Sequence, residues 1–337
     1  MSTPASTIPY FGRAYSLDVY TSLDGSGSPG YTLTSDAWEP EALRMTFEVN
    51  QTAISSAWWF ADISVYNLND TTIQDVLVNA HWVTLKAGYQ ADSAPDHIIW
   101  TGAVMQVLYG RESVVDTRVT FHCFAADPIL NNGLNFTIGP LGSQAQAVQQ
   151  MVAKVKGYDL LSSLPDEFNS KKFVRSKTIF GSIAKYFGQA ADDHNLNWYK
   201  SPQGAAIGSL DSGTDTPDFA YSAPLPADWK GPAPTTTTSY TIIGTPVQDP
   251  HGVSFRVLLD PRIIVKYPAL LVRIDNTIIQ QYALQLGSTD PQFPLQSSYC
   301  VGEVCHRGDT RGDEWYTEIH GFVRAWTLLN ANFLTGQ

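Results

Sequence analysis

The stretch from Leu43 to Phe124 constrains the fold more than any other part of the chain, because strand-like runs follow one another through it. The first run, Leu43–Asn50, alternates apolar and polar residues without a break, which is the period of a strand with one face in a core. Turn residues at 67–70 precede a short helix expected over Thr72–Leu77. Further runs lie at 59–66, 83–87, 98–109 and 117–124. Five strands and one brief helix predict a small antiparallel barrel or sandwich.

Strand periodicity returns in the last third of the chain. Every second residue from Val253 to Leu259 is apolar, and the same holds from Leu270 to Ile274. Further strands are expected at 281–286, 298–306 and 315–323. These runs predict a second barrel.

Helical patterns occur only between the two strand-rich regions. Ser143 is placed to cap a helix whose apolar face includes Val148 and Val155. A second helix is expected from about Lys177, with Phe180 and Ile183 on one face, and a short strand over Leu196–Tyr199 follows it. Recurrent prolines and four consecutive threonines then predict an extended connector.

The sequence therefore predicts a mainly β chain with a small α+β insertion and two antiparallel β-barrels. The predicted segments are a first barrel at 1–138, the insertion at 139–207, the Pro/Thr-rich connector at 208–239 and a second barrel at 240–337.

Composition and charge narrow the classes of function. The chain has 337 residues and a net charge of 21 − 32 = −11. An acidic protein is a poor candidate for binding the phosphates of nucleic acid. The first residues, Met1–Ala5, lack the basic and apolar regions of a secretory signal, and no apolar run reaches the length of a membrane span. Three cysteines are too few for a disulfide framework, which favours folding in a reducing cytosol.

Several phrases of the sequence resemble the tail hub proteins of bacteriophages. In the first strand-rich region these are Tyr66-Asn67-Leu68, Ala87-Gly88-Tyr89 and Trp100-Thr101-Gly102, in the order and spacing of the first barrel of that family. In the second region the stretch from Thr241 to Ile263 resembles the opening of the second hub barrel. The phrase from His306 to Thr317 resembles its close and is the most specific of all.

The resemblance implies a structural, non-enzymatic role in the virion, at the tip of a phage tail assembled in the host cytoplasm. It implies a homotrimeric baseplate hub that joins a hexameric tail tube to a trimeric central spike and contacts other baseplate proteins. It also implies a channel through which DNA passes without specific binding. Two similar barrels per chain would match the two symmetries, because three chains present six barrels. No cofactor and no membrane span are expected.

The cysteines and the Arg-Gly-Asp tripeptides, which suggest metal binding and adhesion, are better explained by structural roles. Cys300 and Cys305 are poorly spaced for zinc binding. They lie five residues apart, and because an odd separation on a strand places side chains on opposite faces, they are expected to point to opposite sides. Cys123 is in phase with the core residues of its strand. Two Arg-Gly-Asp tripeptides are interpreted as a loop whose charges pair within the loop or across a subunit interface. The residues expected at an interface are His306, Arg307, Asp309, Arg311, Asp313 and Trp315. No catalytic, cofactor or metal residue is predicted.

Two other functions stay open from the sequence alone. A tail-associated cell-wall hydrolase would need paired carboxylates in a cleft, and separations between carboxylates are invisible in a sequence. The residues Asp192-Asp193-His194 have the side chains of acid–base or metal chemistry, and they also lie where a helix is expected to end, where such residues commonly form turns. A receptor-binding or glycan-binding tail module would need exposed aromatic residues in a groove, and the chain has nine Trp and sixteen Tyr.

Overall fold

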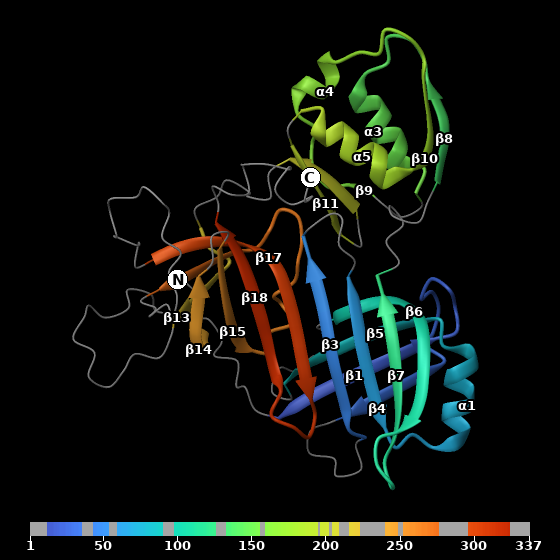
Figure 1. The fold of residues 1–337 in the computed structure, drawn as a ribbon, viewed down its shortest axis with the longest axis vertical. Coiled ribbons are helices and arrows are strands. Elements are labelled where there is room, and N and C mark those ends of the chain that lie inside the picture. Colours follow the sequence, from blue (N-terminus) through green and yellow to red (C-terminus); the bar gives the residue numbers. More distant parts are fainter. Residues whose placement is uncertain are drawn as a thin grey trace, which may run out of the picture.

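The computed structural model describes most of the chain, in twelve segments. These are residues 12–35, 43–53, 59–89, 98–125, 133–155, 159–194, 196–201, 204–208, 216–222, 240–248, 252–275 and 296–323. The expected strand at 281–286 and most of the Pro/Thr-rich connector, residues 209–215 and 223–239, lie outside the described residues. Within them the chain is mainly β, with four helices (Figure 1).

The first half of the chain forms seven strands and one helix. All five strands predicted between 43 and 124 are present, and alternation explains them: along β3 every second residue from Met45 to Gln51 is buried. Asn69 caps the helix by accepting a hydrogen bond from the Thr72 backbone amide. The elements are β1 (Arg13–Tyr20), β2 (Tyr31–Ser35), β3 (Met45–Thr52), β4 (Phe60–Tyr66), α1 (Asp70–Asn79), β5 (Trp82–Tyr89), β6 (Ile98–Arg111) and β7 (Thr117–Phe124).

The last part of the chain forms six more strands of the same large sheet. Along β15, residues 253, 255 and 257 are buried and alternate with more exposed neighbours. The strands are β13 (Phe219–Ser222), β14 (Tyr240–Gln248), β15 (Gly252–Leu258), β16 (Leu271–Asp275), β17 (Gln296–Asp309) and β18 (Trp315–Val323).

The two halves are joined by hydrogen bonding between β3 and β17, so that thirteen strands form one sheet (Figure 1). Pairing is antiparallel except where β13 lies beside β14 and β16. The two ends of the sheet, β2 and β16, do not pair with each other, so the sheet as a whole is not closed into a barrel. Instead, β16 pairs back onto the first residues of β17.

The order in which strands pair is the same in both halves. In the first half it is β3-β4-β7-β6-β5-β1, and in the second it is β14-β15-β18-β17-β16-β13. The fourth strand in each order, β6 or β17, has 14 residues. Each also shifts register against its neighbour, between Val104 and Gln106 in β6 and between Val301 and Glu303 in β17. A β-bulge therefore sits at the same place in both halves.

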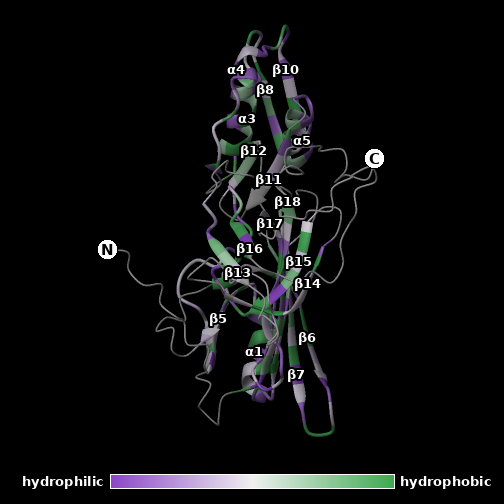
Figure 2. Ribbon diagram, turned by 90° about the vertical axis from the view of Figure 1, so that its left-hand side faces the viewer, coloured by the Kyte–Doolittle hydropathy of each residue, from purple (hydrophilic) through white to green (hydrophobic). Residues whose placement is uncertain are grey.

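A smaller α+β unit lies at one end of the molecule, above β17 and β18 (Figure 2). Its helix α3 (Gln144–Ala153) begins with a capping box between Ser143 and Gln146, and its apolar residues pack in a core of their own. The other elements are β8 (Gly133–Ile138), β9 (Asp159–Leu160), α4 (Asp166–Ser170), β10 (Lys177–Ser182), α5 (Ile183–Asp192), β11 (Asn197–Ser201) and β12 (Gly204–Gly208). The parallel pairing of β9 with β12 and the antiparallel pairing of β11 with β12 form a small sheet.

Two details of this unit differ from the sequence-based expectation. The residues at 133–138, assigned to the end of the first barrel, form β8, which pairs with β10 and buries Leu134 and Ile138 in the smaller core. The second helix begins at Ile183 rather than Lys177. The reason is Gly181, whose φ of 119° lies outside the helical range, so that residues 177–182 form β10 and Phe180 is exposed.

Candidate functional site

The sequence-predicted interface residues lie at the junction of the two halves, where β17 runs between β3 and β18 (Figure 1). Trp315 is buried there and contacts the Phe47 ring edge to face, with ring centroids 5.4 Å apart. The guanidinium of Arg13 lies 5.6 Å from the centroid of the Trp315 ring. These contacts join β1, β3 and β18, so Trp315 is part of the packing within the chain.

His306 is the most deeply buried titratable group at this junction, with no exposed surface. Its Nδ1 lies 2.9 Å from the hydroxyl oxygen of Thr317, which is also buried. Burial lowers the pKa of His306 to about 4, against a weaker opposing effect of Asp260. The imidazole is therefore neutral at physiological pH, and its role is to fill the core between β17 and β18.

The carboxylate of Asp309 organises the turn that follows β17. Both of its oxygens accept hydrogen bonds from Arg44, at 3.2 and 2.6 Å, and one also accepts from the Arg311 backbone amide at 2.9 Å. Burial raises the pKa of Asp309, but the hydrogen bonds from Arg44 and the backbone outweigh it, so that the pKa is lowered. Arg13 adds hydrogen bonds to the backbone carbonyls of Asp309 and Gly312. The turn is thus fixed by residues of the first half.

The two Arg-Gly-Asp tripeptides have different environments. Arg307-Gly308-Asp309 lies within β17, and Gly308 is packed so closely that an added Cβ would approach the Phe47 ring to 2.3 Å. Arg311-Gly312-Asp313 forms the turn between β17 and β18, with Arg311 and Asp313 exposed. Of the six predicted interface residues, these two present the most surface to a partner.

A ladder of charged side chains crosses the face of the sheet opposite the core. Arg307 on β17 lies between Glu48 on β3, at 3.0 Å, and Glu318 on β18, at 3.7 Å. Glu318 also accepts a 3.1 Å hydrogen bond from Arg256 on β15. Two further pairs, Asp62–His122 at 2.6 Å and Glu303–His320 at 3.5 Å, lie on the same side. We call these eight residues the polar ladder: Glu48, Asp62, His122, Arg256, Glu303, Arg307, Glu318 and His320.

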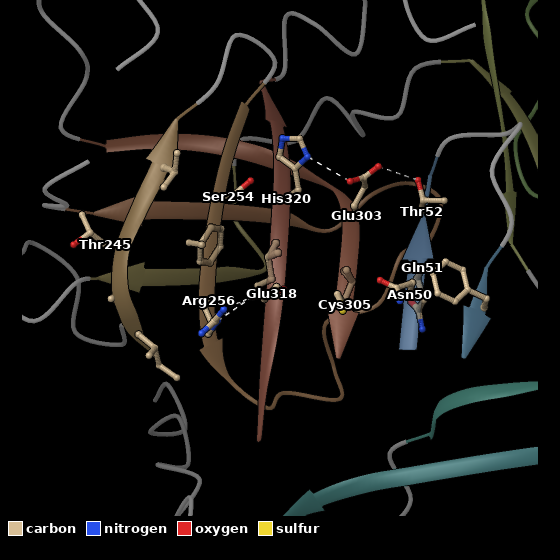
Figure 3. A pocket seen from close by; sticks show the side chains of 17 residues that line it. Asn50, Gln51, Thr52, Thr245, Ser254, Arg256, Glu303, Cys305, Glu318 and His320 are labelled. Atoms are coloured by element: carbon tan, nitrogen blue, oxygen red, sulfur yellow. Dashed lines mark hydrogen bonds and ion pairs between the residues drawn. The ribbon is translucent and has the colours of Figure 1, made fainter. Parts of the chain in front are cut away.

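Part of the polar ladder borders a hollow of about 700 Å³ on the outer surface of the sheet (Figure 3). Figure 3 shows Glu303 between His320 and Thr52, and Arg256 directed at Glu318. Glu318 therefore has a cationic partner in Arg256, and Glu303 has the imidazole of His320 and the hydroxyl of Thr52 beside it. The described residues that line the hollow all belong to extended strands. The sequence did not reveal this ladder, because each charged residue appears there only as the outward position of one strand.

Asp193 and His194, which the sequence offered as candidates for hydrolase chemistry, contact neighbouring side chains of the small α+β unit. His194 stacks on Phe168 with ring centroids 4.1 Å apart, and its Nε2 lies 2.9 Å from the side-chain oxygen of Gln144. Gln144 in turn donates to Asp193 at 3.1 Å. The residues that follow α5 thus tie that helix to the start of α3.

The three cysteines form no disulfide, and Cys123 and Cys300 are buried. The expectation that Cys300 and Cys305 face opposite sides was wrong, because the β-bulge between Val301 and Glu303 adds one residue to β17. Burial raises the pKa of Cys305 to about 11, so its thiol is protonated. Among the described residues, no three His, Cys, Asp or Glu side chains are grouped so that they could hold a metal ion. In the same part of the chain, no helix is long and apolar enough to span a membrane.

Comparison with solved structures places this fold among tail proteins. The tail protein of Neisseria meningitidis MC58 superposes with a TM-score of 0.52 at 12% identity, over 94% of this chain and 99% of that one. The 43 kDa tail protein of prophage MuSo2 from Shewanella oneidensis superposes with a TM-score of 0.50 at 7% identity, over 94% of this chain and all of that one. No protein-family model and no curated protein matches the sequence.

The chain has the fold of phage tail proteins, and the likeness extends over nearly its whole length. The resemblance inferred from the phrases around Tyr66 and His306 is thereby confirmed at the level of the fold.

Proposed function

We propose that this chain is the baseplate hub of a phage tail. In this role three copies form a ring that docks the hexameric tail tube onto the trimeric central spike and leaves a channel for DNA. The hub is a structural, non-enzymatic component of the virion.

The observation that carries the proposal is the repeated strand order of the two halves. When β3–β7 and β14–β18 are each counted from one to five along the chain, both sets lie in the spatial order first, second, fifth, fourth, third. In both sets the fourth strand has 14 residues and contains a β-bulge. The return pairing of β16 onto β17 supports a barrel in the second half. Two barrels per chain give six similar units in a trimer, which is the arrangement that a six-fold tube and a three-fold spike both require.

The polar ladder supplies a suitable wall for the channel. It has four carboxylates and two arginines, and the arginines are held in ion pairs with the carboxylates. A surface of this kind has few free cations for phosphates to bind, so DNA passes along it without being retained. The exposed turn with Arg311 and Asp313 lies beyond the ladder at the end of β17, and we assign it to contacts with a neighbouring baseplate component.

Two measurements on the purified chain test the proposal. Native mass determination is expected to give a trimer of 3 × 37.0 = 111 kDa for the chain alone, or a heavier complex that contains three copies of the chain when the spike is added. Electron microscopy is expected to show the protein bound at one end of tubes assembled from the tail tube protein of the same phage. A protein that binds neither tube nor spike, or that clears a peptidoglycan suspension, would contradict the hub assignment.

A further inference from the structure

The two-stranded sheet of the small α+β unit turns one face to solvent. Among the described strands, β8 and β10 pair only with each other. One side of the pair packs on the core of the unit, where Leu134 and Ile179 are buried. Because side chains alternate along a strand, the residues between them point away from that core. This outer face consists of Asn135, Thr137, Thr178 and Phe180, and all four are exposed.

Phe180 is the most exposed aromatic side chain among the described residues, at 73%. It lies opposite Asn135, and the next pair on the same face, Thr137 and Thr178, is joined by a 3.0 Å hydrogen bond between the two hydroxyls. Figure 1 shows β8 and β10 at the outer edge of the unit, with α3 and α5 beside them. An open aromatic ring next to hydroxyl and amide groups suits a sugar, whose ring has an apolar face of C–H groups and a rim of hydroxyls.

A hollow of about 560 Å³ continues the outer face at Thr137. It is lined by the turn of residues 139–142 and by three glutamines of α3, Gln146, Gln149 and Gln150. None of the described residues that line the hollow or form the outer face is charged. The cation next to the outer face, Lys177, lies instead over the Phe173 ring, 5.1 Å from its centroid. A site without charges favours a neutral ligand over a phosphate, a carboxylate or a cation.

The turn that lines the hollow is held in one conformation by hydrogen bonds. The Leu141 backbone amide donates to the Phe173 carbonyl at 2.8 Å, and the Phe173 amide donates to the Gly142 carbonyl at 2.9 Å. Leu141 has a φ of 65°, in the left-handed region that leucine rarely adopts, and its side chain is 73% exposed. Packing within the unit does not explain a strained residue with its side chain in water, whereas a place at the rim of a binding site does. A hollow that is formed before its ligand arrives loses little entropy on binding.

The hollow combines side-chain amides with apolar surface. Gln149 and Gln150 supply N–H donors and carbonyl acceptors, and Pro140, Leu141 and Ala153 supply the apolar part. The acetamido group of an N-acetylated sugar has the same two parts, an amide and a methyl group. A hydroxyl in its place would leave the glutamine amides without this partner and the apolar surface uncovered.

We propose that the outer face and the hollow bind a neutral oligosaccharide of N-acetylated sugars. The ring of Phe180 packs on one sugar, and the hollow receives the acetamido group of a neighbouring sugar. Thr178 and Thr137 lie between the two contacts, so the ligand is longer than a single sugar ring. This activity goes beyond the hub assignment and does not depend on it. It gives the small unit, at one end of the molecule, the task of attaching the protein to an N-acetylated polysaccharide (Figure 2).

Isothermal titration calorimetry of the full chain with two matched oligosaccharides tests the inference. Chitotetraose is a β-linked tetramer of N-acetylglucosamine, and cellotetraose has the same backbone with a hydroxyl in place of each acetamido group. Chitotetraose is expected to give saturable binding at millimolar concentration. Cellotetraose is expected to bind at least about tenfold more weakly, because it leaves the glutamine amides unpaired.

Three variants locate the binding site. Phe180→Ala removes the exposed ring and is expected to weaken chitotetraose binding about fivefold without lowering the melting temperature. The double variant Gln149→Ala with Gln150→Ala is expected to weaken it by at least about fivefold. The matched control is Phe60→Ala, which removes a 47% exposed ring from β4 of the large sheet and should leave the affinity unchanged.

Failure of chitotetraose to bind at millimolar concentration overturns the inference, as does equal binding of the two oligosaccharides. An affinity that Phe180→Ala or the glutamine variant leaves unchanged, or that Phe60→Ala lowers equally, overturns it too. If a second copy of the chain covers the outer face instead, chitotetraose does not bind and Phe180→Ala lowers the native mass. The native mass of the wild type tests the hub assignment separately, so either proposal can fail while the other stands.

Discussion

The burial of His306 makes the stability of this protein depend on pH. Its folded-state pKa of about 4 lies below the ordinary value of 6.5, so the unfolded chain binds a proton more readily than the folded chain. The contribution of His306 is therefore fully present above pH 6.5 and is lost as the pH falls toward 4. From the two pKa values, the free energy of unfolding should fall by about 2 kcal/mol between pH 7 and pH 5.

Urea unfolding of the wild type and His306→Gln at both pH values measures this effect. The variant is less stable at pH 7, because it disturbs a packed site, but it should lose about 2 kcal/mol less than the wild type on acidification. An equal pH dependence in the two proteins would show that His306 is not the titrating group.

Asp309 and Glu48 allow a buried and a more exposed ion pair at the junction of the two halves to be compared. Asp309 is buried and accepts two hydrogen bonds from Arg44 and one from the backbone, whereas the Glu48 side chain is 44% exposed. Asp309→Asn is expected to cost about 2 kcal/mol in unfolding free energy, and Glu48→Gln less than about 1 kcal/mol. Chemical denaturation of both variants measures the difference, and equal losses would contradict the central role of Asp309 in this turn.

At the scale of the elements, the glycines of the two long strands differ in what surrounds them. An added Cβ at Gly308 in β17 would come within 2.3 Å of the Phe47 ring and 2.9 Å of the Trp315 ring, whereas Gly110 in β6 has open space. Gly308→Ala is expected to destabilise the protein by about 1–3 kcal/mol through overpacking, and Gly110→Ala to be neutral. Thermal unfolding compares them, and a neutral Gly308→Ala would mean that β3 and β17 are less tightly joined than described.

The strands themselves could be predicted from the sequence because alternation is a local signal. The runs beginning at Leu43 and Val253 gave β3 and β15 with small errors at the ends. The start of α5 was misplaced because Phe180 and Ile183 have helical spacing, while the φ of Gly181 is visible only in the structure. Strand pairing joins residues far apart in the chain, so neither the polar ladder nor the bulge that turns Cys300 and Cys305 to one side could be derived from local patterns.

The interface residues were selected by resemblance, and the structure separates them by environment. His306, Asp309 and Trp315 are buried between the two halves, which no local pattern distinguishes from burial between subunits. Arg311 and Asp313 are exposed on a turn, and their role in contact with a partner stays a prediction. The number of barrels likewise stays a prediction.

For the whole molecule, the net charge of −11 and the ion-paired polar ladder predict that duplex DNA is not retained. No shift of a DNA fragment is expected in a gel-retardation assay at physiological salt. The longest basic run is Lys171-Lys172, far along the chain from the ladder. Retention of DNA that weakens steeply with added salt would indicate a nucleic-acid-binding surface and contradict the channel assigned here.

The central claim is that the two halves of the chain are repeats that alternate around one ring. Electron cryo-microscopy of the purified protein, alone and with the spike, tests it most directly through end-on views. The account predicts particles with three-fold symmetry in which six similar β units surround a channel. Particles with one or two copies, or a three-fold ring in which the two halves of each chain lie at different radii, would contradict it.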